Sequence, residues 1–301
     1  MTPAFERIAV IGLGLLGGSV ARAARERDAA KWIAAATRRR DALDAARAAG
    51  VLDVAGTPEE VCVDADLVVL ATPVFAMAET VRRIAPHLRP GALVTDVGSV
   101  KRVLHESLPG LLPRGVSYIG SHPMAGSHHR GFAHARADLF DGAACIVTQT
   151  APSEERDRLC RFWQALGARV HLREPSDHDI EVSWMSHVPH VLAYAFAHAL
   201  SAAPAAAHEV AGAGFRDFTR IARSEPELWG DILTANRKAL SAPLQAAGEA
   251  IERMARAIEA NDSDALEQII GSARDTLAGF PQYETIEQHE PREGHATRDE
   301  E

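Results

Sequence analysis

Cysteine is scarce in this sequence. Three cysteines occur among 301 residues, far apart and beside apolar residues: Cys62, Cys145 and Cys160. Disulfide frameworks and zinc sites are built from cysteines at close, regular spacings, so this pattern argues against both. We expect reduced, buried thiols and a cytoplasmic protein.

Long apolar runs and an excess of positive charge are also absent. No stretch approaches the roughly 20 apolar residues of a membrane span, and no basic region followed by an apolar targeting segment stands at the N-terminus. Lys and Arg number 32 against 41 Asp and Glu, which gives a formal net charge of −9. This balance argues against nucleic acid and membranes as partners.

Short apolar runs alternate with helical patterns in the first half of the chain. The expected strands span residues 7–12, 33–37, 66–72, 92–97 and 117–120, with weaker ones at 144–148 and 169–172. Helices fit between them, for example over residues 75–88. This alternation predicts βαβ units and a doubly wound, mostly parallel sheet.

The pattern changes near Pro175, after which no further strand is expected. Alanine-rich stretches with apolar residues three and four apart continue to about Leu277, with breaks near Pro204, residues 212–214, Pro226 and Asn261. We predict an α/β domain at 1–172, an all-α domain at 173–285 and a disordered acidic tail at 286–301. The helical part is too small to bury all its apolar faces alone, so we expect a homodimer.

A glycine-rich motif follows the first strand and opens a helix. It reads Gly12-Leu13-Gly14-Leu15-Leu16-Gly17. Gly12 suits a tight turn, Gly14 lets the backbone approach a pyrophosphate, and Gly17 allows close packing of helix on strand. The helix N-terminus at Leu15 and Leu16 attracts phosphate. A glycine turn without a ligand is the alternative, but the strand–turn–helix context favours a dinucleotide.

The end of the second strand bears on the choice of cofactor. NAD enzymes usually carry an acidic residue there, whereas this sequence has Thr37, Arg38, Arg39 and Arg40. Arginine forms bidentate contacts with phosphate, so we favour NADP over NAD. The alternative is a solvated helix start. Thr72 and Pro73, which close the third predicted strand, complete the expected cofactor site.

Two further segments stand where strands of the predicted sheet end, at residues 96–101 and 120–127. Doubly wound folds bind ligands at this edge. His122, in the second segment, has an ordinary pKa near neutrality and suits a general base. A structural hydrogen bond is the other interpretation of this histidine. We expect no metal at the site.

Five motifs, taken together and in their order, resemble those of one enzyme family. GLGLLGGS, DVGSVK, GSHPMAGS, SHVPH and GFRDFTRIA occur in the order seen in prephenate/arogenate dehydrogenases. The chain resembles that family over about residues 6–283. The resemblance implies a Rossmann domain followed by a helical dimerisation domain, with the active site between them. The implied reaction is the NAD(P)-dependent oxidative decarboxylation that makes 4-hydroxyphenylpyruvate or tyrosine in tyrosine biosynthesis, by a monofunctional enzyme.

The same resemblance assigns roles to individual residues. His122 corresponds to the essential histidine that bonds the reacting hydroxyl, and Ser99 to a serine beside the cofactor and that hydroxyl. Arg220 corresponds to the arginine that binds a substrate carboxylate. Asp217, three residues earlier, is on the same face if the segment is helical, where it either orients Arg220 or is a surface acid.

The remaining candidates have two interpretations each. His187 and His190 in SHVPH either contact substrate or pack the helix against the first domain, and Trp229 lines the pocket or the core. Ser127 is a substrate-binding candidate, but it is followed by His128 where many relatives have glutamate. This departure leaves the substrate open between prephenate and arogenate.

Other functions remain as alternatives. The first is a related dehydrogenase that acts on a modified prephenate or on a 3-hydroxy acid. The second, of another class, is a regulatory dimer that binds nucleotide without catalysis. Retention of His122, Ser99 and Arg220 argues against the second.

Overall fold

The computed structural model describes residues 3–126, 129–149 and 151–280. The chain forms two compact units, Met1–Gln245 and Ala246–Glu301. Their boundary falls inside helix α11 (Arg237–Glu259), two residues after Pro243, which cannot donate a hydrogen bond within the helix.

The tail expected at 286–301 lies outside the described residues, and the domain limits drawn from the sequence stay predictions. Nowhere in the described ranges does a helix have the length and apolarity to cross a bilayer.

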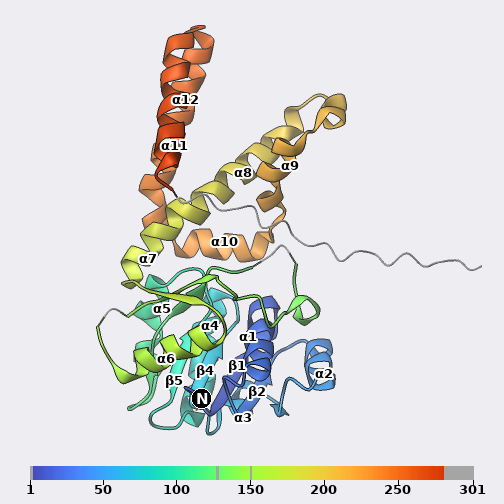
Figure 1. Ribbon diagram of the computed structural model, residues 1–301, viewed down its shortest axis with the longest axis vertical. Helices are drawn as coiled ribbons and strands as arrows, with labels where there is room; N and C mark the ends of the chain where they lie inside the picture. Colours follow the sequence, from blue (N-terminus) through green and yellow to red (C-terminus); the bar gives the residue numbers. More distant parts are fainter. Residues whose placement is uncertain (1–2, 127–128, 150, 281–301) are drawn as a thin grey trace, which may run out of the picture. The chain divides into compact units, whose positions relative to one another are not determined.

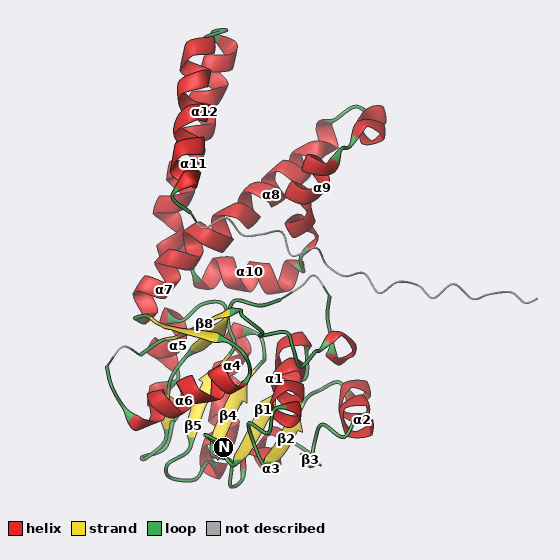
Figure 2. Ribbon diagram, in the orientation of Figure 1, coloured by secondary structure: helices red, strands yellow, loops and turns green. Residues whose placement is uncertain are grey.

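A six-stranded parallel sheet organises the first unit (Figures 1 and 2). Its strand order is β3-β2-β1-β4-β5-β6, which reverses direction between β1 and β4. The strands are β1 (Arg7–Ile11), β2 (Trp32–Ala36), β3 (Val54–Ala55), β4 (Leu67–Leu70), β5 (Leu93–Asp96) and β6 (Ser117–Tyr118). This is the doubly wound, Rossmann-type order predicted from the sequence. The two-residue β3 was not predicted, because so short a strand leaves no periodic signal.

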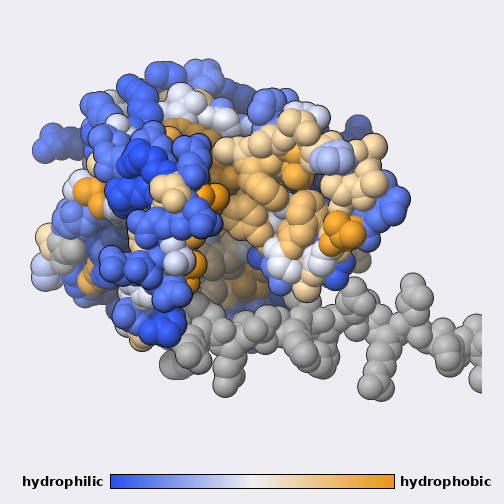
Figure 3. Space-filling model, turned by 90° about the horizontal axis from the view of Figure 1, so that it is seen from above, coloured by the Kyte–Doolittle hydropathy of each residue, from blue (hydrophilic) through white to orange (hydrophobic). Residues whose placement is uncertain are grey.

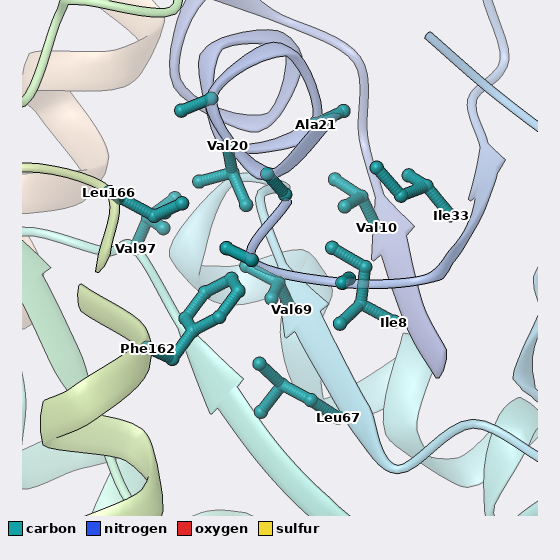
Figure 4. Packing of buried hydrophobic residues seen from close by; sticks show 14 of the residues in the cluster. Ile8, Val10, Val20, Ala21, Ile33, Leu67, Val69, Val97, Phe162 and Leu166 are labelled. Atoms are coloured by element: carbon teal, nitrogen blue, oxygen red, sulfur yellow. The ribbon is translucent and has the colours of Figure 1, made fainter. Parts of the chain in front are cut away.

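Helices cover both faces of this sheet. Side chains alternate along β1, so that Ile8 and Val10 belong to one buried cluster and Ala9 and Ile11 to the other. The first cluster lies under α1 (Leu15–Glu26), α2 (Arg40–Ala48) and α6 (Glu154–Ala165), and the second under α3 (Pro58–Cys62), α4 (Val74–Ile84) and α5 (Arg102–Ser107). Figure 4 shows Val20 of α1 and Phe162 of α6 over the first face.

A second, three-stranded sheet follows. It contains β7 (Ser121–Pro123), β8 (Ala144–Val147) and β9 (Arg169–Leu172), with β7 antiparallel to β8 and β8 parallel to β9. The two weaker predicted strands are therefore confirmed. The strand expected at 117–120 ends at Tyr118, because the chain passes between sheets at Gly120. A Cβ at Gly120 would lie 2.6 Å from Thr148 Oγ1, so only glycine fits this crossing.

Helices complete the first unit, as the sequence predicted. They are α7 (Pro175–Val182), α8 (Val188–Ala199), α9 (Ala213–Arg220) and α10 (Pro226–Ala235), with a π-helical turn at Ser183–His187. The predicted breaks are confirmed by the start of α9 after Gly212 and by Pro226 in the first turn of α10. Ile232 and Ala235 of α10 join the buried cluster beneath α4.

Apolar side chains are exposed on these helices. Phe196 of α8 contacts Phe215 and Phe218 of α9, and all three side chains remain exposed. Figure 3 shows the apolar surface over α8 and α9.

The second unit comprises the rest of α11 and helix α12 (Ser263–Ala278). Asn261 has a φ of 50° between the two helices, which makes the break expected there, and the Asp262 side chain caps α12 by accepting from the Ala265 amide. No residue of α12 is buried, and large apolar residues such as Ile258 and Ile270 are exposed.

Candidate active site

The glycine turn lies at the carboxyl end of β1, where the strand order reverses. Gly12 has a φ of +105°, and a Cβ there would lie 2.4 Å from the Ala71 carbonyl oxygen. A Cβ on Gly17 would lie 2.0 Å from the Gly12 carbonyl oxygen. Glycine is therefore required at both positions by the turn itself.

Gly14 differs, because no atom lies within 4 Å of the place its Cβ would take. It is the N-cap of α1, which has neither a side-chain cap nor an acidic residue in its first turn. The first N–H groups of α1, including those of Leu15 and Leu16, therefore lack intrahelical partners, and the position beside Gly14 is open. Such a helix start suits a phosphate.

A second observation supports a cofactor at this edge. The Thr72 side-chain oxygen, just beyond β4, is buried without a hydrogen-bond partner among the described residues. A Cβ on Gly12 would lie 3.4 Å from Thr72 Cγ2, so this threonine adjoins the glycine turn. Pro73 is the N-cap of α4. A buried unpaired hydroxyl is costly, and a polar ligand group at the turn would satisfy it. These residues fit a dinucleotide.

The arginines after β2 are not equivalent. The Arg39 guanidinium forms an ion pair with Asp41 at 2.7 Å, and its backbone amide donates to Thr37 Oγ1 at 3.3 Å. Arg38 and Arg40 are exposed. The ion pair with Asp41 was not anticipated, and it engages Arg39 before any ligand binds.

Buried Asp96 joins the two segments that carry Ser99 and His122. Its carboxylate accepts from the Gly98 amide at 2.8 Å and from the Ser121 amide at 3.2 Å, and it pairs with the buried Lys101 ammonium. Gly98 immediately precedes the half-buried Ser99, and Ser121 immediately precedes the buried His122. One carboxylate thus holds both candidate residues at the same edge of the sheet.

The strand that carries His122 is fixed by side chains as well. Ser121 Oγ accepts from the Trp163 indole N–H at 2.9 Å and lies 2.8 Å from Thr95 Oγ1. These buried contacts place β7 against the end of β5. His122, only 8% exposed, therefore sits on a rigid element and keeps a small accessible area.

A chain of buried hydrogen bonds runs from His122. Its Nδ1 lies 2.8 Å from His178 Nε2, and His178 Nδ1 lies 2.8 Å from Asp179 Oδ1. Asp179 also accepts from the backbone amides of Lys101 at 2.7 Å and Arg102 at 3.0 Å. His122 Nε2 has no hydrogen-bond partner in the described ranges.

Lowered pKa values keep His122 and His178 of this hydrogen-bonded series neutral. Burial lowers the pKa of His122 well below its ordinary value, and His178, Lys101 and His187 add to the effect. Burial also lowers the pKa of His178. For Asp179, burial alone raises the pKa, but hydrogen bonds from His178 and the two amides outweigh it and the net pKa is lowered. At neutral pH these three hydrogen-bonded groups are therefore a carboxylate, on Asp179, and two neutral imidazoles, on His178 and His122.

An aromatic cluster surrounds the SHVPH segment. His190 and Trp229 stack with ring centroids 3.5 Å apart, and His187 meets Trp229 edge-on. Asn236 Nδ2 donates to the Asp179 carbonyl at 2.9 Å and lies 3.0 Å from His187 Nδ1. The structure thus joins His187, but not His190, to the segment behind His122.

Arg220 is the last residue of α9 and is exposed. Burial lowers the pKa of His190, and the charge of Arg220 lowers it further, which places the guanidinium within electrostatic reach of that ring. Asp217 is exposed, and no ion pair links it to Arg220 in the described part of the chain. Its orienting role stays a prediction. Ser127 and His128 lie outside the described residues.

Sequence reasoning missed His178, Asp179 and Asn236. The only signal for the first two is an adjacent His-Asp pair in a polar stretch at the start of a helix, which is also typical of a solvated surface. The contact between His178 and His122 spans 56 residues and depends on tertiary packing. Among the residues that the structure describes, no three His, Cys, Asp or Glu side chains form a group able to hold a metal ion.

Oxidation of an alcohol by a nicotinamide cofactor requires a base for the hydroxyl proton beside the hydride acceptor. A neutral histidine held at the same sheet edge as a phosphate-binding turn meets this requirement. Fold and site therefore define a dinucleotide-dependent dehydrogenase.

Comparison with known proteins gives the family. The family model described as the prephenate dehydrogenase nucleotide-binding domain matches residues 20–172, and the one described as the dimerization domain matches residues 174–272. The chain belongs to the prephenate dehydrogenase family, as its motifs predicted.

Individual relatives span nearly the whole chain. Cyclohexadienyl dehydrogenase of Zymomonas mobilis is 33% identical over 269 residues, covering 87% of this chain and 92% of that protein. Prephenate dehydrogenase of Bacillus subtilis is 31% identical over 289 residues, covering 92% and 76%. The crystal structure of A. aeolicus prephenate dehydrogenase with hydroxyphenyl propionate and NAD+ matches with a TM-score of 0.81 at 26% identity, covering 91% of this chain and 98% of that one.

Proposed function

We propose that the protein oxidises prephenate, or its amino counterpart arogenate, and releases carbon dioxide as the ring becomes aromatic. The observation that carries the proposal is the neutral, buried His122 on strand β7, which Asp96 anchors at the same edge of the sheet as the glycine turn. The product is 4-hydroxyphenylpyruvate from prephenate or tyrosine from arogenate.

His122 takes the proton of the ring hydroxyl at Nε2. A bound nicotinamide would supply the hydride acceptor, and loss of the ring carboxylate as carbon dioxide would make the product aromatic. The product oxygen would then take the proton back from His122 to give the phenol. Because the pKa of His122 is lowered, the imidazole is neutral and ready to accept that proton. Ser99 bonds the same hydroxyl and orients it toward His122.

Arg220 binds a substrate carboxylate, by two parallel hydrogen bonds from its planar guanidinium. His190 and Trp229 form a stacked wall beside it and position the ring for hydride transfer. His187 supports the wall through its edge contact with Trp229. Ser127 contributes a hydroxyl at the substrate entrance, and Asp217 orients Arg220.

For the cofactor, NADP is preferred over NAD. Gly14 and the open start of α1 hold the pyrophosphate, while Thr37 and the arginines after β2 hold the adenosine end. Because Arg39 is already paired with Asp41, Arg38 carries most of the contact with a 2′-phosphate.

The protein acts as a homodimer in the cytoplasm. The exposed phenylalanines of α8 and α9 and the uncovered apolar residues of α12 support association through the helical part. Three free cysteines are consistent with a reducing compartment.

The test is the initial rate of cofactor reduction by purified protein, with prephenate and arogenate each offered with NADP and NAD. The proposal expects fast turnover with at least one of the two substrates, and faster with NADP. No turnover in any combination, with cofactor binding intact, contradicts it and points to a modified prephenate, a 3-hydroxy acid or a regulatory dimer without catalysis.

A further inference from the structure

The hydrogen-bond chain behind His122 supports an inference that rests on the proposed function and extends it. We propose that His178 and Asp179 are positioning residues. They fix His122 in the tautomer that carries its proton on Nδ1, and they support the positive charge that His122 gains during turnover.

The donor and the acceptor in each of these hydrogen bonds follow from the groups that can donate a proton. The Asp179 carboxylate only accepts, so the proton on His178 must lie on Nδ1, 2.8 Å away. Neutral His178 then presents a lone pair at Nε2. The contact of 2.8 Å with His122 Nδ1 therefore requires a proton on His122 Nδ1. The lone pair of His122 is left on Nε2, the nitrogen that takes the substrate proton.

Asp179, at the end of this series of hydrogen bonds, is fixed by several backbone and side-chain contacts. Backbone amides of Lys101 and Arg102 fix the two oxygens of Asp179, and the Asn236 amide binds its carbonyl. His178 is fully buried and Asp179 is 2% exposed. With so few alternative positions available, the carboxylate cannot turn to accept a proton from elsewhere, and His178 cannot reverse its ring without losing a buried hydrogen bond.

When the substrate O–H bond breaks, its proton moves to His122 Nε2 and the ring becomes an imidazolium that still donates from Nδ1 to His178. Lys101 and His187 also lie near His122, and the Lys101 charge opposes this new positive charge. Asp179 is the negative group bonded into the chain, and it acts through neutral His178. No proton has to pass beyond His122.

The test compares two substitutions at one position. His178→Leu removes the acceptor for His122 Nδ1, whereas His178→Gln keeps an acceptor oxygen toward His122 and a donor toward Asp179. We expect His178→Leu to lower kcat about 100-fold, within the range that general base catalysis contributes, with little change in KM. We expect His178→Gln to recover most of that loss.

His105→Leu is the matched control. His105 is also a half-buried histidine with a side-chain hydrogen bond, but its partner is Thr148. Its kcat should stay near the value of the unsubstituted protein. A merely structural loss at His178 would lower the active fraction and melting temperature in both His178 variants alike and would not be recovered by glutamine.

A spectroscopic readout decides the inference without any substrate. In protein labelled with ¹⁵N-histidine, the His122 signal, assigned by its loss in His122→Asn, should show a proton on Nδ1 and a free Nε2. In His178→Leu this preference should disappear, and in His178→Gln it should remain. A proton on Nε2 of His122 in the unsubstituted protein overturns the inference, even if His178→Leu fails to fold.

The two proposals fail in different ways. Turnover of prephenate or arogenate with kcat unchanged in His178→Leu overturns the positioning role and leaves the proposed function standing. Absence of turnover with the expected Nδ1–H signal overturns the proposed function and leaves the tautomer assignment standing.

Discussion

Asp96 and Lys101 form an ion pair in which both side chains are wholly buried. Tyr118 and the amides of Gly98 and Ser121 also bond this carboxylate, so one buried charge serves four partners. Removing one member of a buried pair leaves an unpaired charge, which costs about 3–5 kcal/mol. Asp96→Ala should lower the free energy of unfolding by about this amount in urea titration. The exposed pair of Glu79 and Arg82 supplies the control, Glu79→Gln, which should unfold like the unsubstituted protein. Equal stability of both variants would contradict this account of Asp96.

Two glycines of the turn have different roles, Gly17 in folding and Gly14 in cofactor binding, and substitutions can test them separately. Gly17→Ala introduces a Cβ 2.0 Å from a backbone oxygen and should lower the melting temperature strongly. Gly14→Ala meets no protein atom and should cost about 1 kcal/mol or less as a poorer N-cap. Its methyl group enters the space assigned to the pyrophosphate, so its Kd for cofactor should rise about tenfold or more, roughly 1.4 kcal/mol. Melting curves and fluorescence titration with reduced cofactor measure the two effects. Unchanged cofactor affinity in Gly14→Ala would place the phosphates elsewhere.

Cofactor preference should depend on Arg38. Loss of a charge-assisted contact with a 2′-phosphate at an exposed site is expected to raise KM for NADP about tenfold and to leave KM for NAD unchanged. Arg38→Gln tests this in steady-state assays with both cofactors. Arg47→Gln is the control, because Arg47 lies near the other end of α2 and donates to the Ala55 carbonyl. An equal change for NAD and NADP would contradict a role in phosphate recognition.

Acid should destabilise the protein through its buried histidines. Burial lowers the pKa of His187 from 6.5 to about 4, and it lowers those of His122 and His178 as well. Between pH 6.5 and pH 4 the unfolded chain therefore binds more protons than the native protein. The contribution of His187 is fully present above pH 6.5 and falls by about 1.4 kcal/mol per pH unit as pH decreases through this window. His122 and His178 act in the same direction. Urea unfolding at several pH values measures the slope, and His187→Gln should reduce it by about one proton. A slope that His187→Gln leaves unchanged would contradict the assignment.

Much of the fold could be predicted because its signals are local. The apolar run of β1, the glycine motif and the breaks at Pro226 and Asn261 each reflect a constraint within a few residues. The sequence also predicts that His122 follows the strand at 117–120, which ends at Tyr118, but His122 itself lies within β7 of a second sheet.

The rest of the site depends on contacts between distant segments. Nothing in the residues around His178 indicates that it meets β7, and Asp179 has the same local pattern as a surface acid. The ion pair that engages Arg39 involves a residue only two positions away, but the run of arginines does not by itself indicate that Asp41 pairs with one of them. Local patterns thus predict elements and candidate residues, whereas the partners of buried polar groups follow from tertiary packing.

The central claim is that His122 is the base for the reacting hydroxyl. The most direct measurement is kcat for cofactor reduction by His122→Asn, with the Kd for cofactor measured in parallel. We predict that kcat falls about 10²- to 10⁴-fold, the usual contribution of a general base, while the cofactor Kd stays the same. A kcat within a few-fold of that of the unsubstituted protein would contradict the account.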